Sequence, residues 1–188
     1  MAKHFFLRWA AAGEHEWLVA DGSRLSQPEH GDLTAAAAIA RNSKLTLLLP
    51  ASWVVHTEAD VPAKGAAALR QAIPYALEDQ FAVDVESLHF AIGSRGANGV
   101  AVATIDHRRL TGIMQSLAEV GLRPERVVDE ADLLSADTLL LARDEAIFHL
   151  AGGNRAGCDH STLPLLFSDG VMPANLLHTA EAETALNQ

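Results

Sequence analysis

The sequence has a single cysteine and few basic side chains. Cys158 has no second cysteine to pair with, so no disulfide can form within the chain, as is usual in a reducing cytoplasm. Its 14 Lys and Arg residues stand against 24 Asp and Glu residues, which gives a formal net charge of −10. This charge repels the phosphate backbone of nucleic acids, so it argues against nonspecific nucleic-acid binding and favours a basic protein partner.

Long apolar runs are also missing. The best of them, residues 44–50, is far shorter than the ~20 residues that a helix needs to cross the hydrocarbon of a bilayer. Near the start, residues 5–7 are followed by Arg8, so the continuous apolar core of a secretory signal is lacking. We therefore expect no membrane span in this sequence, and we expect the first apolar residues to form a strand.

The patterns that accompany catalysis and metal binding are absent. Nine histidines are scattered, and the only close pair of candidate ligands is Cys158 and His160, whereas zinc sites use three or four protein ligands. No Gly-x-Ser-x-Gly elbow occurs. The glycines at 93, 96 and 99 are not followed by the Lys-Ser/Thr pair of a phosphate-binding loop and are expected to form a loop. We expect no catalytic residue, no cofactor and no metal.

What is present is the composition of a globular α/β protein. Of its 188 residues 49% are apolar and 20% charged, enough for one large or two small domains. The expected strands are residues 5–11, 16–20, 44–49, 53–59, 87–92, 100–105, 126–128, 138–141, 146–150 and 155–158. Thr34 is expected to cap a helix over residues 35–41. Residues 100–128 are expected to form a β-α-β unit, with Asp106 capping its helix and Gly121 ending it.

The most informative stretch is an amphipathic helix that contains a proline. Leu69, Ile73, Leu77 and Phe81 recur at every fourth residue, so one face is apolar at the helical period. Pro74 has no N–H to donate to the carbonyl of residue 70, which predicts a bend or a restart there. Pro62 suits the first turn of this helix.

Four carboxylates follow this helix within a short distance and have no basic neighbour in sequence. We predict that this acidic surface, with one arginine of the helix, binds a partner protein through charge steering and apolar contact. The alternative is a solvated acidic face without a partner. The predicted partner-binding residues are Arg70, Glu78, Asp79, Asp84 and Glu86.

The same stretch carries a family resemblance. The run Leu-Arg-Gln-Ala-Ile-Pro-Tyr-Ala-Leu-Glu-Asp-Gln-Phe at residues 69–81 resembles the cytoplasmic domain of the type II secretion system L protein, a component of the inner-membrane platform. Further segments match in the same order, so the resemblance extends from about residue 45 to residue 166. These segments are residues 48–50, 88–90, 121–124 and 127–129.

The resemblance implies an actin-like fold built from ribonuclease H-type mixed-sheet modules with packed helices. We expect a first module over residues 1–130, with an inserted α/β middle region, and a second, possibly truncated module over residues 131–188. It also implies a non-enzymatic scaffold on the cytoplasmic face of the inner membrane, which recruits the secretion ATPase, contacts other platform proteins and forms a homodimer. The family carries a membrane-spanning helix after this region, so we expect the chain to be a fragment.

Two other functions stay open at this point. Actin-like ATPases hold phosphate at an acidic, glycine-containing turn between their first two strands, and here that turn is Ala-Ala-Gly-Glu-His at residues 11–15. Glu14 is a poor substitute for the aspartate of those proteins, which counts against an ATP-binding assembly protein, whereas a nucleotide-dependent melting shift would favour it. The third possibility is a soluble enzyme or sensor, disfavoured because no paired catalytic groups occur at a readable spacing.

Overall fold

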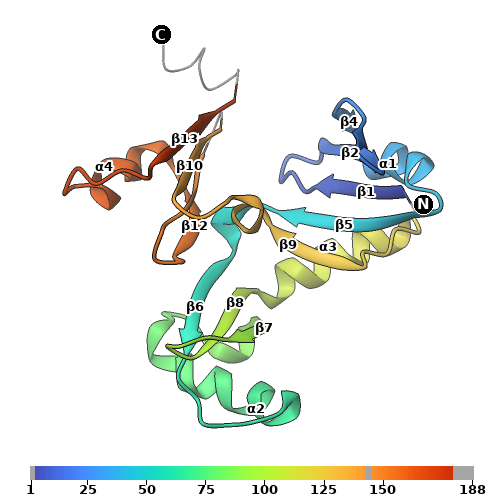
Figure 1. Ribbon diagram of the computed structural model, residues 1–188. Coiled ribbons are helices and arrows are strands. Elements are labelled where there is room, and N and C mark those ends of the chain that lie inside the picture. The colour runs from blue at the N-terminus through green and yellow to red at the C-terminus, as the bar shows by residue number, and fades with distance from the viewer. Residues whose placement is uncertain (1–2, 143–144, 180–188) are drawn as a thin grey trace. The chain divides into compact units, whose positions relative to one another are not determined.

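The computed structural model describes residues 3–142 and 145–179, which fall into two compact units (Figure 1). Unit 1 comprises residues 1–52 and 113–188, and unit 2 comprises residues 53–112. The helix α3 (His107–Glu119) begins in unit 2 and ends in unit 1. The connection between the strands expected at residues 138–141 and 146–150 contains residues 143–144, which lie outside the described residues, as does the polar stretch from residue 180.

Unit 1 contains a six-stranded sheet in the order β3-β2-β1-β5-β9, with β4 paired to β2. β1 and β2 form an antiparallel hairpin, whereas β5 runs parallel to β1 and β9 runs parallel to β5. The helix α1 (Leu33–Ile39) connects β4 to β5. The strands are β1 (Lys3–Arg8), β2 (His15–Asp21), β3 (Arg24–Leu25), β4 (Glu29–Gly31), β5 (Ser43–Leu49) and β9 (Arg126–Asp129).

Alternation along these strands explains why they form one layer with a buried face. Phe5 and Leu7 on β1, Trp17 on β2 and Leu47 on β5 are at most 3% exposed, because alternate side chains of a strand point to the same face. The rings of Phe5 and Trp17 stack with their centroids 6.4 Å apart. The hydrophobic core of this sheet is therefore formed by residues that the alternation in the sequence already marks.

A second, four-stranded sheet of unit 1 has the order β12-β11-β10-β13. It repeats the pairing of the first sheet, since β10 and β11 form an antiparallel hairpin, β12 continues it antiparallel and β13 pairs with β10 in parallel. Leu139 and Ala146 are fully buried in its core. The elements are β10 (Thr138–Leu141), β11 (Ala146–His149), β12 (Arg155–Cys158), α4 (Leu163–Leu166) and β13 (Asn175–His178).

Unit 2 is a three-stranded antiparallel sheet packed against the helix α2 (Ala66–Leu77). Ile73 and Leu77 of α2 pack into one buried cluster with Val100 and Val102, as the four-residue period predicts. The helix runs through Pro74 without a restart. The strands are β6 (Val55–Ala59), β7 (Leu88–Arg95) and β8 (Val100–Asp106), in the order β6-β8-β7.

Several local expectations are wrong. The β-α-β unit over residues 100–128 does not form, because β8 pairs with β6 and β7 in unit 2 whereas β9 pairs with β5 in unit 1. Asp32, not Thr34, caps α1, since its side chain accepts a 2.8 Å hydrogen bond from the N–H of Ala35. The strand expected at residues 53–59 begins only at Val55, and α2 begins at Ala66 instead of near Pro62.

One further expectation needs adjustment, and two others are confirmed. β7 runs through Gly93 to Arg95, so only the last glycines of the predicted loop close the hairpin, where the N–H of Gly96 donates to the carbonyl of Gly99 at 2.7 Å. Asp106 does cap α3, because its side chain accepts a 2.7 Å hydrogen bond from the N–H of Arg109. Gly121, with φ of 79°, ends this helical segment as expected, since the left-handed conformation there suits glycine.

A buried carboxylate ties three distant segments of unit 1 together. Glu130 lies in the short 3-10 turn Glu130–Leu133 and is 8% exposed. Its carboxylate accepts a hydrogen bond from Arg8, at the end of β1, and forms an ion pair with that side chain. Its second oxygen accepts a 3.3 Å hydrogen bond from the N–H of Ala51. Burial raises the pKa of Glu130, and the nearby Arg8 opposes that rise. Without these donors the buried carboxylate would be strongly unfavourable.

We predict that Glu130→Ala lowers the free energy of unfolding by about 2–3 kcal/mol, because the Ala51 N–H and the Arg8 guanidinium lose their acceptor. Glu130→Gln retains an acceptor oxygen for one donor and should cost less. Urea unfolding followed by circular dichroism measures both changes. Glu14→Ala is the control, since this exposed side chain should change stability by less than about 0.5 kcal/mol. Equal stability of Glu130→Ala and the control would contradict the role of Glu130.

A close backbone approach in unit 1 provides a second test of packing. A Cβ on Gly157 of β12 would lie 2.6 Å from the backbone nitrogen of Ser52 and 3.0 Å from the backbone carbon of Ala51. Glycine is therefore required at this position by steric contact with the segment that follows β5.

Gly157→Ala should lower the free energy of unfolding by about 1–3 kcal/mol, because the added methyl group forces the two backbone segments apart. Gly152→Ala is the matched control, since a Cβ there meets no atom within 4 Å. Thermal and urea unfolding of the two variants measure the difference. Indistinguishable midpoints would show that the approach at Gly157 is looser than described.

Candidate functional site

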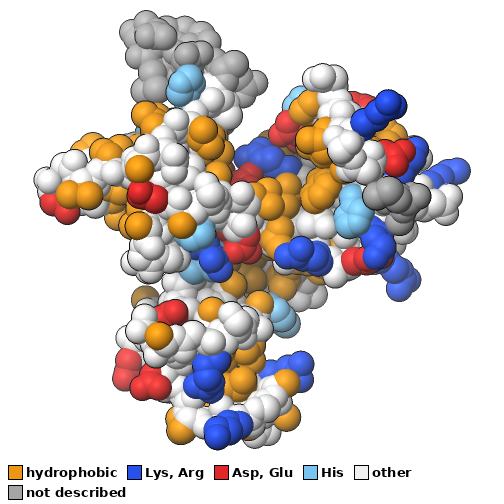
Figure 2. Space-filling view, in the orientation of Figure 1, with side chains coloured by type: hydrophobic (Ala, Val, Ile, Leu, Met, Phe, Trp, Pro, Cys, Tyr) orange, Lys and Arg blue, Asp and Glu red, His pale blue; other side chains and the backbone are white. Residues whose placement is uncertain are grey.

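The predicted partner-binding residues lie together on unit 2 and are all exposed. Arg70 lies on α2, while the four acidic residues belong to the turns that connect α2 to β7. In Figure 2 red side chains gather over these turns, which Figure 1 draws in green. The acidic residues are Glu78, Asp79, Asp84 and Glu86. We call the two turns that carry these residues the acidic turns of unit 2.

The four carboxylates do not have the same local role. Asp84 caps the 3-10 turn Val85–Ser87, since its side chain accepts a 2.9 Å hydrogen bond from the N–H of Glu86. Within the described residues, the side chains of Glu78 and Asp79 form no ion pair or hydrogen bond. The side chain of Glu86 likewise has no such partner, so Glu78, Asp79 and Glu86 are free for a partner, whereas Asp84 also holds its own turn.

An exposed aromatic side chain adjoins the acidic turns. Tyr75 is 76% exposed on the face of α2 that points away from Ile73 and Leu77, and Val83 is 55% exposed between the two turns. Sequence reasoning missed both residues because it followed the apolar stripe that packs inward. Tyr75 does not follow the four-residue period of that stripe, and this departure is the sequence signal that indicates its exposure. Exposed tyrosine beside charge is common at the centre of protein interfaces.

The turn between β1 and β2 is closed by its own hydrogen bonds. The N–H of Ala10 donates to Nδ1 of His15 at 3.2 Å, and the N–H of Gly13 donates to the carbonyl of Ala10 at 3.2 Å. Burial lowers the pKa of His15, so the neutral ring can accept this bond, although Asp32 opposes the shift. The ring also packs on Trp9 at 4.4 Å between centroids. These N–H groups are therefore not free to hold a phosphate.

The end of β1 carries a cation rather than a free carboxylate. Arg8 is bound to Glu130 and lies 3.6 Å from a carboxylate oxygen of Glu145. Both oxygens of Glu130 already accept hydrogen bonds, and Glu14 in the turn is exposed. The side chains of Arg8 and Glu130 therefore satisfy each other, and Glu14 is the exposed carboxylate of this turn.

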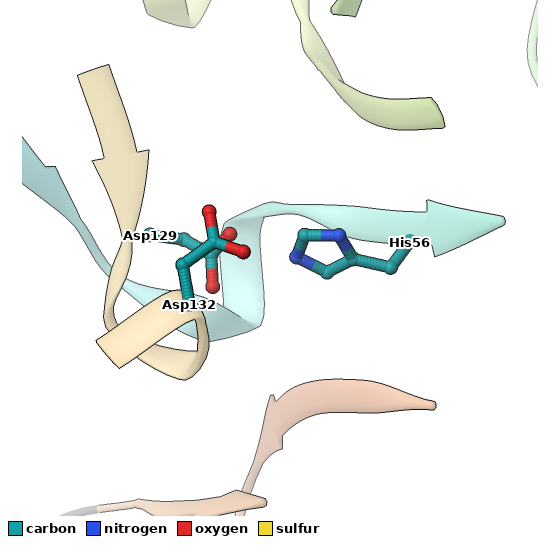
Figure 3. A group of neighbouring side chains, drawn as sticks. All are labelled: His56, Asp129 and Asp132. Atoms are coloured by element: carbon teal, nitrogen blue, oxygen red, sulfur yellow. The ribbon is translucent and has the colours of Figure 1, made fainter. Parts of the chain in front are cut away.

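Two aspartates approach each other where β9 ends in unit 1 (Figure 3). Oxygens of Asp129 and Asp132 lie within 4.8 Å of one another. Asp129 accepts a 2.9 Å hydrogen bond from the N–H of Ala131, and Asp132 pairs with Arg155 at 3.1 Å. Figure 3 also labels His56, which belongs to unit 2 and is not combined with them. Within unit 1 these carboxylates have structural partners, and two ligands do not make a metal site.

The close pair of candidate ligands in the sequence, Cys158 and His160, is also unsuited to hold zinc. Cys158, at the end of β12, is half-buried, and burial raises the pKa of its thiol with further contributions from Asp159 and Glu145. Because zinc binds the thiolate, a raised pKa weakens this candidate ligand.

Comparison with known proteins identifies the family. The family model of the type II secretion system protein L matches residues 7–185. The protein L of Dickeya chrysanthemi is 26% identical over 173 residues, which are 85% of this chain and 42% of the relative. That of Pseudomonas aeruginosa is 30% identical over 153 residues, which are 80% of this chain and 39% of the relative. The chain thus spans about two fifths of these curated relatives.

Solved structures show the same fold. The cytoplasmic domain of EpsL, an inner-membrane component of the type II secretion system of Vibrio cholerae, matches with a TM-score of 0.79 and 22% identity, over 95% of this chain and 83% of that one. A chain of the PilM–PilN type IV pilus biogenesis complex matches with a TM-score of 0.58 and 14% identity, over 82% of this chain and 60% of that one. The mixed α/β, actin-like fold expected from the sequence is confirmed. The chain belongs to the type II secretion system protein L family.

Proposed function

We propose that this chain is a non-enzymatic scaffold that recruits the secretion ATPase to the inner-membrane platform of a type II secretion system. The observation that carries the proposal is the exposed acidic surface of unit 2, in which the carboxylates of Glu78 and Asp79 closely follow the exposed Tyr75 in the chain. A negative surface speeds encounter with a basic partner, and an aromatic side chain supplies the area whose burial holds it.

Membership of the protein L family supports the placement of the chain at the cytoplasmic face of the bacterial inner membrane, in contact with other platform proteins. None of the helices within residues 3–142 and 145–179 is long and apolar enough to cross a bilayer. We further propose that the chain acts as a homodimer, as multimeric platforms require repeated copies.

We also propose that the chain is divided into two modules between residues 130 and 131. It falls between β9, which completes the first sheet of unit 1, and β10, which begins the second. The pairing of β3-β2-β1-β5 recurs in β12-β11-β10-β13, which supports a duplicated module. The self-satisfied hydrogen bonds around Arg8 and His15 support a scaffold rather than an ATPase, because nucleotide hydrolysis needs free donors and a metal-binding carboxylate.

Reversing two charges should slow the encounter with the ATPase. We predict that Glu78→Lys combined with Asp79→Lys lowers the association rate constant for the N-terminal region of the cognate ATPase by about tenfold at low salt. The effect should shrink as salt is raised, because the Debye length falls to about 8 Å at physiological ionic strength. Surface-based binding kinetics at several salt concentrations measure it.

A matched control separates local placement from net charge. Glu14→Lys combined with Glu29→Lys makes the same change of total charge at exposed positions of unit 1. This control should leave the association rate nearly unchanged. The siting on unit 2 is rejected if both double variants slow association equally, or if neither does.

Removing the aromatic ring should act on dissociation instead. Tyr75→Ala is expected to increase the dissociation rate constant about tenfold with little change in association, since it removes buried contact area but no charge. Leu25→Ala, a 68% exposed apolar residue of unit 1, is the control. An unchanged dissociation rate for Tyr75→Ala would remove this ring from the interface.

A further inference from the structure

We propose that unit 1 carries a second protein-binding site, a groove between α1 and the end of α3 that accepts a short acidic and apolar segment of another protein. This groove encloses about 750 Å³. It is formed by residues of unit 1 alone, so it is separate from the acidic turns of unit 2. The inference goes beyond the proposed recruitment of the ATPase and does not rest on it.

One wall of the groove is a helix face made of small side chains. Thr34, Ala37, Ala38 and Arg41 are spaced by three or four residues along and just after α1, so they share one side of the helix. Three of these positions carry no more than three heavy side-chain atoms, and the groove stays open for that reason. A side chain of the size of leucine on a partner has room where α1 supplies only methyl groups.

The opposite wall and the floor are held in place by the end of α3. The chain reverses at Gly121, where the N–H of Leu122 donates to the carbonyl of Leu117 at 2.9 Å. Glu119, Val120 and Leu122, on both sides of this turn in sequence, all line the groove. Leu45 and Leu122 are 4% and 7% exposed, so the floor is both apolar and fixed. The groove is therefore pre-formed, which lowers the conformational cost of binding.

The lining of the groove carries two arginines, Arg41 and Arg123, and one carboxylate, that of Glu119. Arg41 and Arg123 are exposed, and neither forms an ion pair with any residue in the described parts of the chain. Lys3, Lys44 and Arg126 lie at the start of the same parallel strands, and Lys44 pairs with Glu125 at 3.3 Å. Figure 2 shows blue side chains on this side of unit 1, where Figure 1 draws the start of β5.

This local positive charge stands out in a chain whose formal net charge is −10. Two guanidinium groups without an ion pair in the described parts of the chain line the same groove as Leu45 and Leu122, and they complement a segment that carries carboxylates beside an apolar side chain. A planar anionic membrane could reach the exposed arginines, but it could not fill the groove. A peptide satisfies both the charge and the shape, so the occupant is a protein segment.

The test uses a display library of random 12-residue peptides, selected on the whole chain. The expected result is enrichment of peptides that combine Asp or Glu with Leu or a similar side chain. Binding of an enriched, fluorescein-labelled peptide, measured by polarisation, should weaken about tenfold or more for Arg41→Glu combined with Arg123→Glu. Arg24→Glu combined with Arg108→Glu makes the same charge change at exposed positions outside the groove and should have little effect.

A second pair of variants tests the shape independently of charge. Ala38→Trp places a large ring into the groove from an exposed position and should abolish peptide binding, whereas Ala35→Trp, outside the lining on the same helix, should not. Circular dichroism establishes that each variant is folded. No enrichment of acidic peptides, or equal binding by all variants, overturns the proposal. Co-sedimentation with phosphatidylglycerol vesicles that depends on Arg41 and Arg123, without any peptide selection, also overturns it in favour of a membrane surface.

Discussion

The arrangement of unit 1 depends on one buried carboxylate. Glu130 can be buried only because Arg8 and the Ala51 N–H bind its two oxygens, and these groups come from the end of β1 and from the segment after β5. The same contact therefore fixes where the first sheet ends and where the chain leaves toward the second. It also occupies the charged groups at the edge where an actin-like ATPase would hold its metal and phosphate.

Several groups of the chain are exposed and can contact other molecules. Among them are the carboxylates of the acidic turns near Tyr75 in unit 2 and the arginines around the α1–α3 groove in unit 1. The two sets carry opposite charge, and each lies beside apolar residues of its own unit. An actin-like fold can in this way present separate contact surfaces.

Much of this could be predicted from the sequence because it depends on local periodicity. Both hairpins, β5 and the buried face of α2 follow from alternation or from the four-residue spacing. The β-α-β expectation failed because the partner of β9 is β5, about eighty residues earlier, and local patterns carry no information on such pairing. The exposure of Glu78 and Asp79 was predictable, since unpaired carboxylates are rarely buried. Tyr75 and the groove were not, because each depends on which side of a helix the fold covers.

Opposite charges on one chain raise the question of how partners are told apart. The acidic turns and the groove rim would each attract many proteins of opposite charge, and the attraction fades beyond about 8 Å at physiological ionic strength. Charge can therefore set the rate of encounter but cannot alone decide which partner stays. Discrimination has to come from the apolar element at each surface, a projecting ring at Tyr75 and a recess over Leu45. A projection and a recess demand partners of opposite shape, so the two surfaces can select different proteins even when both are exposed to the same mixture.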